Sequence, residues 1–102
     1  MNTDFSVETA RLLNKALTFF QAGQYFECHE WIETQLWLNE LDPQQKRFYQ
    51  RLIQLAVAQH HHANSNPRGY ALQQQKALHG IEQHTPPQHQ WFQRFVVEQP
   101  LL

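Results

Sequence analysis

The sequence predicts an all-α protein, a compact bundle of four main helices with a short fifth helix near the C-terminus. Apolar residues recur every three or four positions over most of the chain, which is the period of a helix surface. The few glycines and prolines stand between these stretches, where helices end and begin. No segment alternates polar and apolar residues over the length of a strand, so strands are not expected.

Residue types at the predicted helix ends support each boundary. Asp4 or Ser6 can cap the first helix, and Gly23 follows its last turn. Asp42-Pro43 and Asn66-Pro67 each combine a capping side chain with a proline at the first helical position. Thr85-Pro86-Pro87 is a break before the last helix. The expected helices are residues 7–22, 24 or 25–40, 43–63, 67–79 and 88–98, with Gly80 near the end of the fourth.

Length and composition restrict the class of protein. The chain has 102 residues, which fits one domain. Its net charge of −1 gives no overall field to recruit nucleic acid or an anionic membrane. There is no apolar run near the length of a membrane span, and Cys28 is the single cysteine, so no intrachain disulfide forms. We expect a soluble, cytoplasmic protein that binds neither nucleic acid nor membrane.

The second predicted helix carries an acid on a mostly apolar face. At about 100° per residue, Glu33 falls between Phe26 and Trp37 on one flank and Leu36 on the other. His29 lies one turn earlier on the same face. A carboxylate shielded from water needs partners, because burying it alone is unfavourable.

The third predicted helix offers partners on one narrow polar stripe. Gln50, Gln54 and His61 lie within about 40° of one another, and the rest of this helix is largely apolar. We therefore expect the stripe to meet the acidic face of the second helix, with Glu33 and His61 in one network. The predicted polar cluster comprises His29, Glu30, Glu33, Gln50, Gln54 and His61.

Three motifs also resemble those of the family called domain of unknown function 309. Residues 20–37, 48–61 and 66–69 are similar to its first, second and third motifs, so the resemblance covers roughly residues 5–80. It implies a small all-helical protein without an assigned activity. Arg51 and Ser65 stand where the family usually has glycine. The resemblance implies that the recurring polar residues are His29, Glu30, Glu33, Gln54 and His61.

Several chemistries remain open for the polar cluster. His29, Glu30, Glu33 and His61 are competent ligands for a divalent metal, but they lack the spacing of a zinc-protease helix or a di-iron bundle. Glu30 or Glu33 could instead act as a general base oriented by His61. The simpler interpretation is a polar network that fixes the register of the helices, with no cofactor and with Cys28 in the core.

We favour a non-catalytic interaction or accessory module, with an unidentified protein partner or a homodimer left open. The alternatives are a metal-dependent hydrolase or other small enzyme, and a small-molecule binder in the cleft between the second and third helices. An exposed apolar patch at residues 91–96 would favour the first, bound metal the second, and a pocket with Glu33 at its base the third. Lys46, Arg47 and Arg51 could bind phosphate, although a solvated basic face is the simpler interpretation.

Overall fold

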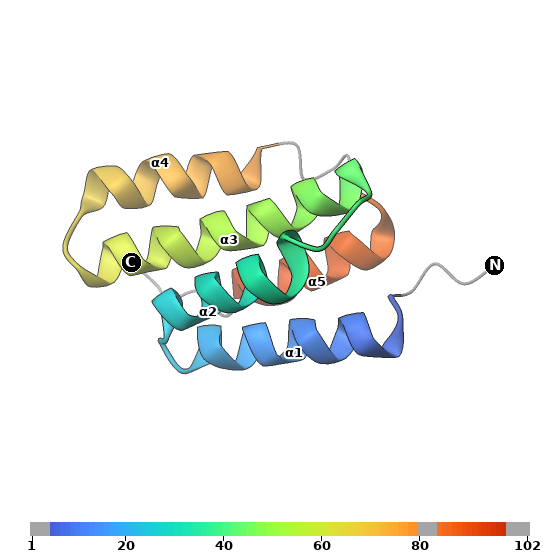
Figure 1. Cartoon of the computed structure of the whole chain (residues 1–102). Helices are drawn as coiled ribbons and strands as arrows, with labels where there is room; N and C mark the ends of the chain where they lie inside the picture. The colour runs from blue at the N-terminus through green and yellow to red at the C-terminus, as the bar shows by residue number, and fades with distance from the viewer. Residues whose placement is uncertain (1–4, 80–83, 98–102) are drawn as a thin grey trace.

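The computed structural model describes residues 5–79 and 84–97, and in this part of the chain the fold is all-α, as predicted. The first four helices run antiparallel side by side, with the last helix behind them (Figure 1). The third helix is central, since it contacts the second, fourth and fifth. The elements are α1 Val7–Gln21, α2 Tyr25–Ile32, the π-helix η1 Glu33–Trp37, α3 Pro43–Ala63, α4 Pro67–Leu78 and α5 Pro86–Val97.

Capping side chains fix three of the helix starts where the sequence predicted them. Ser6 Oγ accepts the backbone N–H of Thr9 at 3.1 Å. The Asp42 carboxylate accepts the N–H of Gln45 at 3.0 Å, and the Asn66 amide oxygen accepts that of Gly69 at 3.0 Å. Each bond satisfies an N–H group that has no partner within its own helix.

The expectation of one continuous α-helix from residue 24 or 25 to residue 40 is wrong. After Ile32 the chain forms a π-helix that ends at Trp37, and the N–H of Leu38 donates to the Glu33 carbonyl at 2.9 Å, an i to i+5 bond. A π turn holds more residues than an α turn, so the angles assigned to the residues after Glu33 do not apply. Leu36 is buried, and Trp37 lies under Lys46, whose Nζ is 4.1 Å from the ring centre.

Helix α3 has the expected bounds, and the ends of α1, α4 and α5 lie within two residues of expectation. Helix α4 ends at Leu78, and Gly80 lies outside the described residues. Helix α5 begins at Pro86 rather than at Gln88. The backbone N–H of Thr85 donates to Gln88 Oε1 at 2.9 Å, which closes the first turn earlier than the proline pair suggested. None of the described helices has the length and apolar character needed to cross a membrane.

Helix α5 docks on the bundle and completes its core. Phe92 and Phe95 are 1% and 0% exposed, and the Phe95 ring meets Phe20 edge-on with 5.4 Å between ring centres. The apolar side chains at residues 91–96, whose exposure would have favoured an interaction module, are therefore largely internal. Large apolar side chains are exposed at other positions, namely Val7, Phe26, Leu38, Leu41, Leu72, Leu78 and Val97.

A serine in a left-handed conformation allows a first prediction. Ser65 has φ of 58° in the turn between α3 and α4. Since L-residues are strained in this region, Ser65→Gly should raise the free energy of unfolding by about 0.5–1 kcal/mol, measured by urea denaturation. Gly23 supplies the converse test, because its φ is 75° and Gly23→Ala should destabilise although open space surrounds the position. An unchanged or lower stability of Ser65→Gly would contradict the prediction.

Candidate functional site

The structure brings together one pair from the predicted cluster. His29 Nε2 lies 3.8 Å from Glu33 Oε1, one helical turn apart, and the two side chains are 27% and 42% exposed. The expectation that Glu33 is shielded from water is therefore wrong. The side chains expected to cover it, Gln54 and His61, lie toward α4 instead. Glu30 is exposed on α2.

His61 lies on the side of α3 that faces α4. Its Nδ1 is 3.2 Å from the Asn66 amide nitrogen, and a side chain at Gly69 would approach the imidazole to 2.6 Å. Gln54 borders a cavity between α3 and α4, and Gln50 joins it in a smaller neighbouring cavity. The structure thus divides the predicted cluster between two sides of α3.

The described residues pair His61 with no carboxylate. Within residues 5–79 and 84–97, no group of three histidine, cysteine, aspartate or glutamate side chains is arranged to hold a metal ion. Cys28 is fully buried in the core, as predicted, and its thiol donates to the Ala16 carbonyl at 3.3 Å. Burial raises the pKa of Cys28 to about 12, so this thiol is a poor nucleophile at neutral pH.

Helix α2 presents an aromatic side chain between two hollows. The Phe26 side chain is 53% exposed. On one side lies a hollow of about 200 Å³ between α2 and α3, formed by Tyr25, Phe26, His29, Val57 and His60. On the other side lies a hollow of about 350 Å³ between α1 and α2, formed by Phe19, Phe26, Glu27, Glu30, Trp31 and Thr34. We call Phe26, Glu27, Glu30, Glu33 and these two hollows the α2 surface.

Sequence reasoning missed a chain of buried polar contacts that joins α5 to α3. Gln88, only 4% exposed, donates from Nε2 to Gln45 Oε1, and Gln45 Nε2 lies 2.9 Å from the Tyr49 hydroxyl. Gln59 was also missed, and it is fully buried. The sequence did contain a signal that these two glutamines are buried, since each lies on the apolar face of its helix. Gln88 lies four and seven positions before Phe92 and Phe95, and Gln59 lies four and seven positions after Leu55 and Leu52.

His84 lies at the basic end of α3. Its ring meets Phe48 edge-on with 5.8 Å between ring centres, and both ring nitrogens are buried without a hydrogen-bond partner among the described residues. Burial is the largest cause that lowers the pKa of His84 below its ordinary value of 6.5. The charges of Arg51, Arg47 and His89 lower it further, and the nearby Gln88 side chain opposes part of the shift. The neutral form is therefore favoured in the folded protein.

This shift predicts a loss of stability in mild acid. Above the unfolded pKa of about 6.5 both states hold His84 neutral, so its contribution is fully present there. As the pH falls through the lower folded pKa, the unfolded state binds the proton more readily and the free energy of unfolding decreases. Thermal unfolding between about pH 7 and pH 5 should show this decrease, and His84→Phe should reduce it. The exposed His62→Gln serves as the control, and an equal slope in both variants would contradict the assignment.

Fold and site define a small helical module in which one helix surface combines an exposed aromatic ring with carboxylates. The chain belongs to the family described as Domain of unknown function (DUF309), which it matches over residues 13–72, in agreement with the resemblance of its motifs. It is 41% identical over 51 residues to the "Uncharacterized protein YpuF" of Bacillus subtilis (strain 168). That alignment covers 50% of this chain and 29% of the Bacillus protein. No solved structure gives a significant match.

Proposed function

We propose that this chain is a non-catalytic protein-interaction module and that the α2 surface is its contact surface. The observation that carries the proposal is the half-exposed Phe26 ring between two hollows. Exposed aromatic side chains next to apolar pockets are typical anchors of protein interfaces. The α2–α3 hollow can receive an apolar side chain from a partner. The Phe26 ring, which borders the hollow, would pack against that side chain.

The size of the α2–α3 hollow favours a partner side chain over a free small molecule. Its volume is about 200 Å³, whereas pockets for small ligands occupy about 300–1,000 Å³. A small-molecule binder was expected to have a pocket with Glu33 at its base. Glu33 is not among the residues that form this hollow. A single leucine or phenylalanine of a partner is the better fit.

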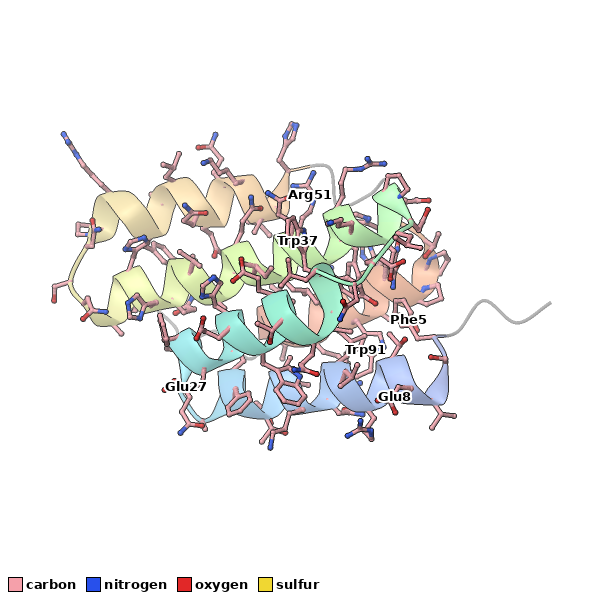
Figure 2. The ribbon with its side chains drawn as sticks, in the orientation of Figure 1. Phe5, Glu8, Glu27, Trp37, Arg51 and Trp91 are labelled. Carbon is pink, nitrogen blue, oxygen red and sulfur yellow. The ribbon has the colours of Figure 1, made fainter. Side chains whose placement is uncertain are left out.

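The charge of the α2 surface indicates the chemistry of the partner. Glu27, Glu30 and Glu33 lie within seven residues, and Figure 2 shows Glu27 projecting away from the start of α2. In the described part of the chain no lysine or arginine pairs with these three carboxylates. The basic group beside this surface is Lys15, whose Nζ lies over the Phe19 and Trp31 rings. Complementary charge directs association, so the proposed partner segment carries lysine or arginine on either side of its apolar anchor.

An enzymatic role is supported less well. A general base or a metal site requires several side chains that converge on one point. The described residues supply one such contact, the His29–Glu33 pair, and its carboxylate is 42% exposed. His61, the third candidate, contacts Asn66 and lies close to the backbone of Gly69, on the side of α3 that faces α4.

The test uses synthetic peptides in which one leucine or phenylalanine is flanked by lysines, with glutamate-flanked peptides for comparison. Binding is measured by NMR titration of the labelled protein. The lysine peptides should shift the amide signals of α2, and Phe26→Ala should weaken their binding at least tenfold, about 1.4 kcal/mol. Leu72→Ala is the matched control, since Leu72 is 52% exposed on α4. Equal weakening by both variants, or no binding by any lysine peptide, would refute the proposal.

A second copy of the chain is the alternative occupant of the α2 surface. Sedimentation equilibrium distinguishes it, because a homodimer built on this surface would dissociate in Phe26→Ala and in Glu30→Gln. We expect a monomer at micromolar concentration. The cytoplasmic location remains a prediction that the unpaired Cys28 supports.

A further inference from the structure

The charges of the chain are unevenly distributed along its sequence. Residues 43–79 contain no aspartate or glutamate. The five basic residues of this segment are Lys46, Arg47, Arg51, Arg68 and Lys76. Helices α3 and α4 lie side by side in antiparallel directions (Figure 1), so the end of α4 returns to the first half of α3. The fold thereby brings Lys76 next to Arg51.

Two adjoining cavities lie at this junction. The smaller, of about 170 Å³, is formed by Arg47, Gln50, Arg51 and Gln54. The larger, of about 440 Å³, is formed by Arg51, Gln54, Leu72, Gln75, Lys76 and His79. Arg51 and Gln54 belong to both cavities, and Figure 2 shows Arg51 between α3 and α4. We call the two cavities together the α3–α4 groove.

The Arg51 guanidinium makes one hydrogen bond that fixes its orientation, and another of its N–H groups has no partner among the described residues. Its Nη1 donates to the Lys76 carbonyl at 2.6 Å, which fixes the orientation of the planar group. Its Nε and the Gln54 Oε1 are buried and have no hydrogen-bond partner among the described residues. Unpaired buried polar groups are uncommon and call for an explanation. The Arg51 Nε–H is a donor that an anion in the groove would satisfy, whereas Gln54 Oε1 is an acceptor and does not itself indicate an anion.

A purely structural role accounts for part of this arrangement. A cation near the last carbonyls of a helix offsets the partial negative charge there, and the bond from Arg51 to Lys76 does this for α4. That role uses one N–H group of Arg51. It gives no reason for Arg47, Gln50 and Gln54 to converge on the neighbouring cavity.

We infer that the α3–α4 groove binds the phosphoryl group of a small molecule, either inorganic phosphate or a phosphate ester. Guanidinium groups match the oxygens of a phosphoryl anion with paired N–H donors, and the glutamine amides supply further donors. Lys76 and His79 border the larger cavity, where they can offset a second negative charge. Leu72 lines the same cavity and offers apolar contact to the organic part of an ester.

An extended nucleic-acid strand fits this surface less well. Sequence-independent binding of single strands relies on aromatic side chains on which bases stack. The residues that form the groove include none apart from the imidazole of His79. The groove is also separate from the α2 surface, so this inference does not rest on the proposed function.

The test is an NMR titration of the full chain with sodium phosphate, a simple phosphate monoester and sodium chloride at matched ionic strength. Phosphate and the monoester should cause saturable shifts of the Arg47 and Arg51 side-chain signals, and chloride should not. Arg47→Gln should weaken binding at least tenfold. Arg51→Lys should also weaken it, because an ammonium group keeps the charge but lacks the paired N–H donors of a guanidinium. Arg68→Gln and Phe26→Ala are the controls and should leave the affinity unchanged.

Arg47 is exposed, so Arg47→Gln should keep the fold intact, as its thermal unfolding curve will verify. The inference is overturned if phosphate and the monoester cause no saturable shift in the native chain. It is equally overturned if Arg68→Gln weakens binding as much as Arg47→Gln. Tighter binding of a single-stranded oligonucleotide than of the monoester, through the same residues, would also overturn it and identify a nucleic-acid surface instead.

Discussion

Phe95→Ala should lower the free energy of unfolding by about 3–5 kcal/mol, the range for removing a buried phenylalanine. Phe95 is fully buried and contacts Phe20 on α1, so the substitution leaves a cavity between α1 and α5. Small domains have a total stability of about 5–15 kcal/mol, and the loss should therefore be a large fraction of it. Urea denaturation followed by circular dichroism at 222 nm, a standard helical wavelength, measures the effect.

Val97→Ala is the control for this experiment, because Val97 lies on the same helix with 76% of its surface exposed. It should change the free energy of unfolding by less than about 0.5 kcal/mol. A loss below about 1 kcal/mol in Phe95→Ala would mean that α5 can leave the bundle without disturbing the rest of the core. Docking of α5 would then contribute little to stability.

Gln59→Leu should raise the free energy of unfolding by about 1–3 kcal/mol. The Gln59 side chain is 0% exposed, and its amide nitrogen and oxygen have no partner in the described part of the chain. The amide thus gives up its hydrogen bonds to water on folding without replacing them, and leucine has no such groups to desolvate. Thermal and urea unfolding of the variant measure the gain.

Gln73→Leu, on the neighbouring helix α4, provides a comparison at a position that is not fully buried. It should change stability by less than about 0.5 kcal/mol. Destabilisation by Gln59→Leu of more than about 1 kcal/mol would show that a bound water or another group satisfies the amide. The sign of the change in the free energy of unfolding therefore decides whether Gln59 destabilises the fold or makes a stabilising hydrogen bond in it.

The helical architecture could be predicted because its signals are local. Ser6, Asp42 and Asn66 each cap a helix through a bond that spans three residues, so a few neighbouring letters contain the information. The docking of α5 could also be predicted, since Phe92 and Phe95 are too apolar to remain in water. The change from α-helix to π-helix at Glu33 leaves no such signal. It changes the carbonyl to which each N–H donates, but the pattern of apolar residues does not reveal that change.

The candidate site could be predicted only in part, for a geometric reason. The helical wheel placed Gln54 and His61 on one stripe of α3, but α2 and α4 both pack against α3 and both are partly polar. Sequence alone does not decide whether that stripe meets α2 or α4. Gly69 settles the matter in the structure, since the absence of a side chain there lets α4 approach His61 closely. The basic groove follows from the same contact between α3 and α4.

The separation of charge between α2 and the α3–α4 pair has a consequence for encounters in solution. The molecule is nearly neutral, with a net charge of −1, yet Glu27, Glu30 and Glu33 lie on one side of α3 and Arg47, Arg51 and Lys76 on the other. The local fields of these two surfaces are therefore opposite in sign. On the proposals made above, one surface attracts a basic partner and the other an anionic ligand, and both attractions should weaken as the salt concentration rises.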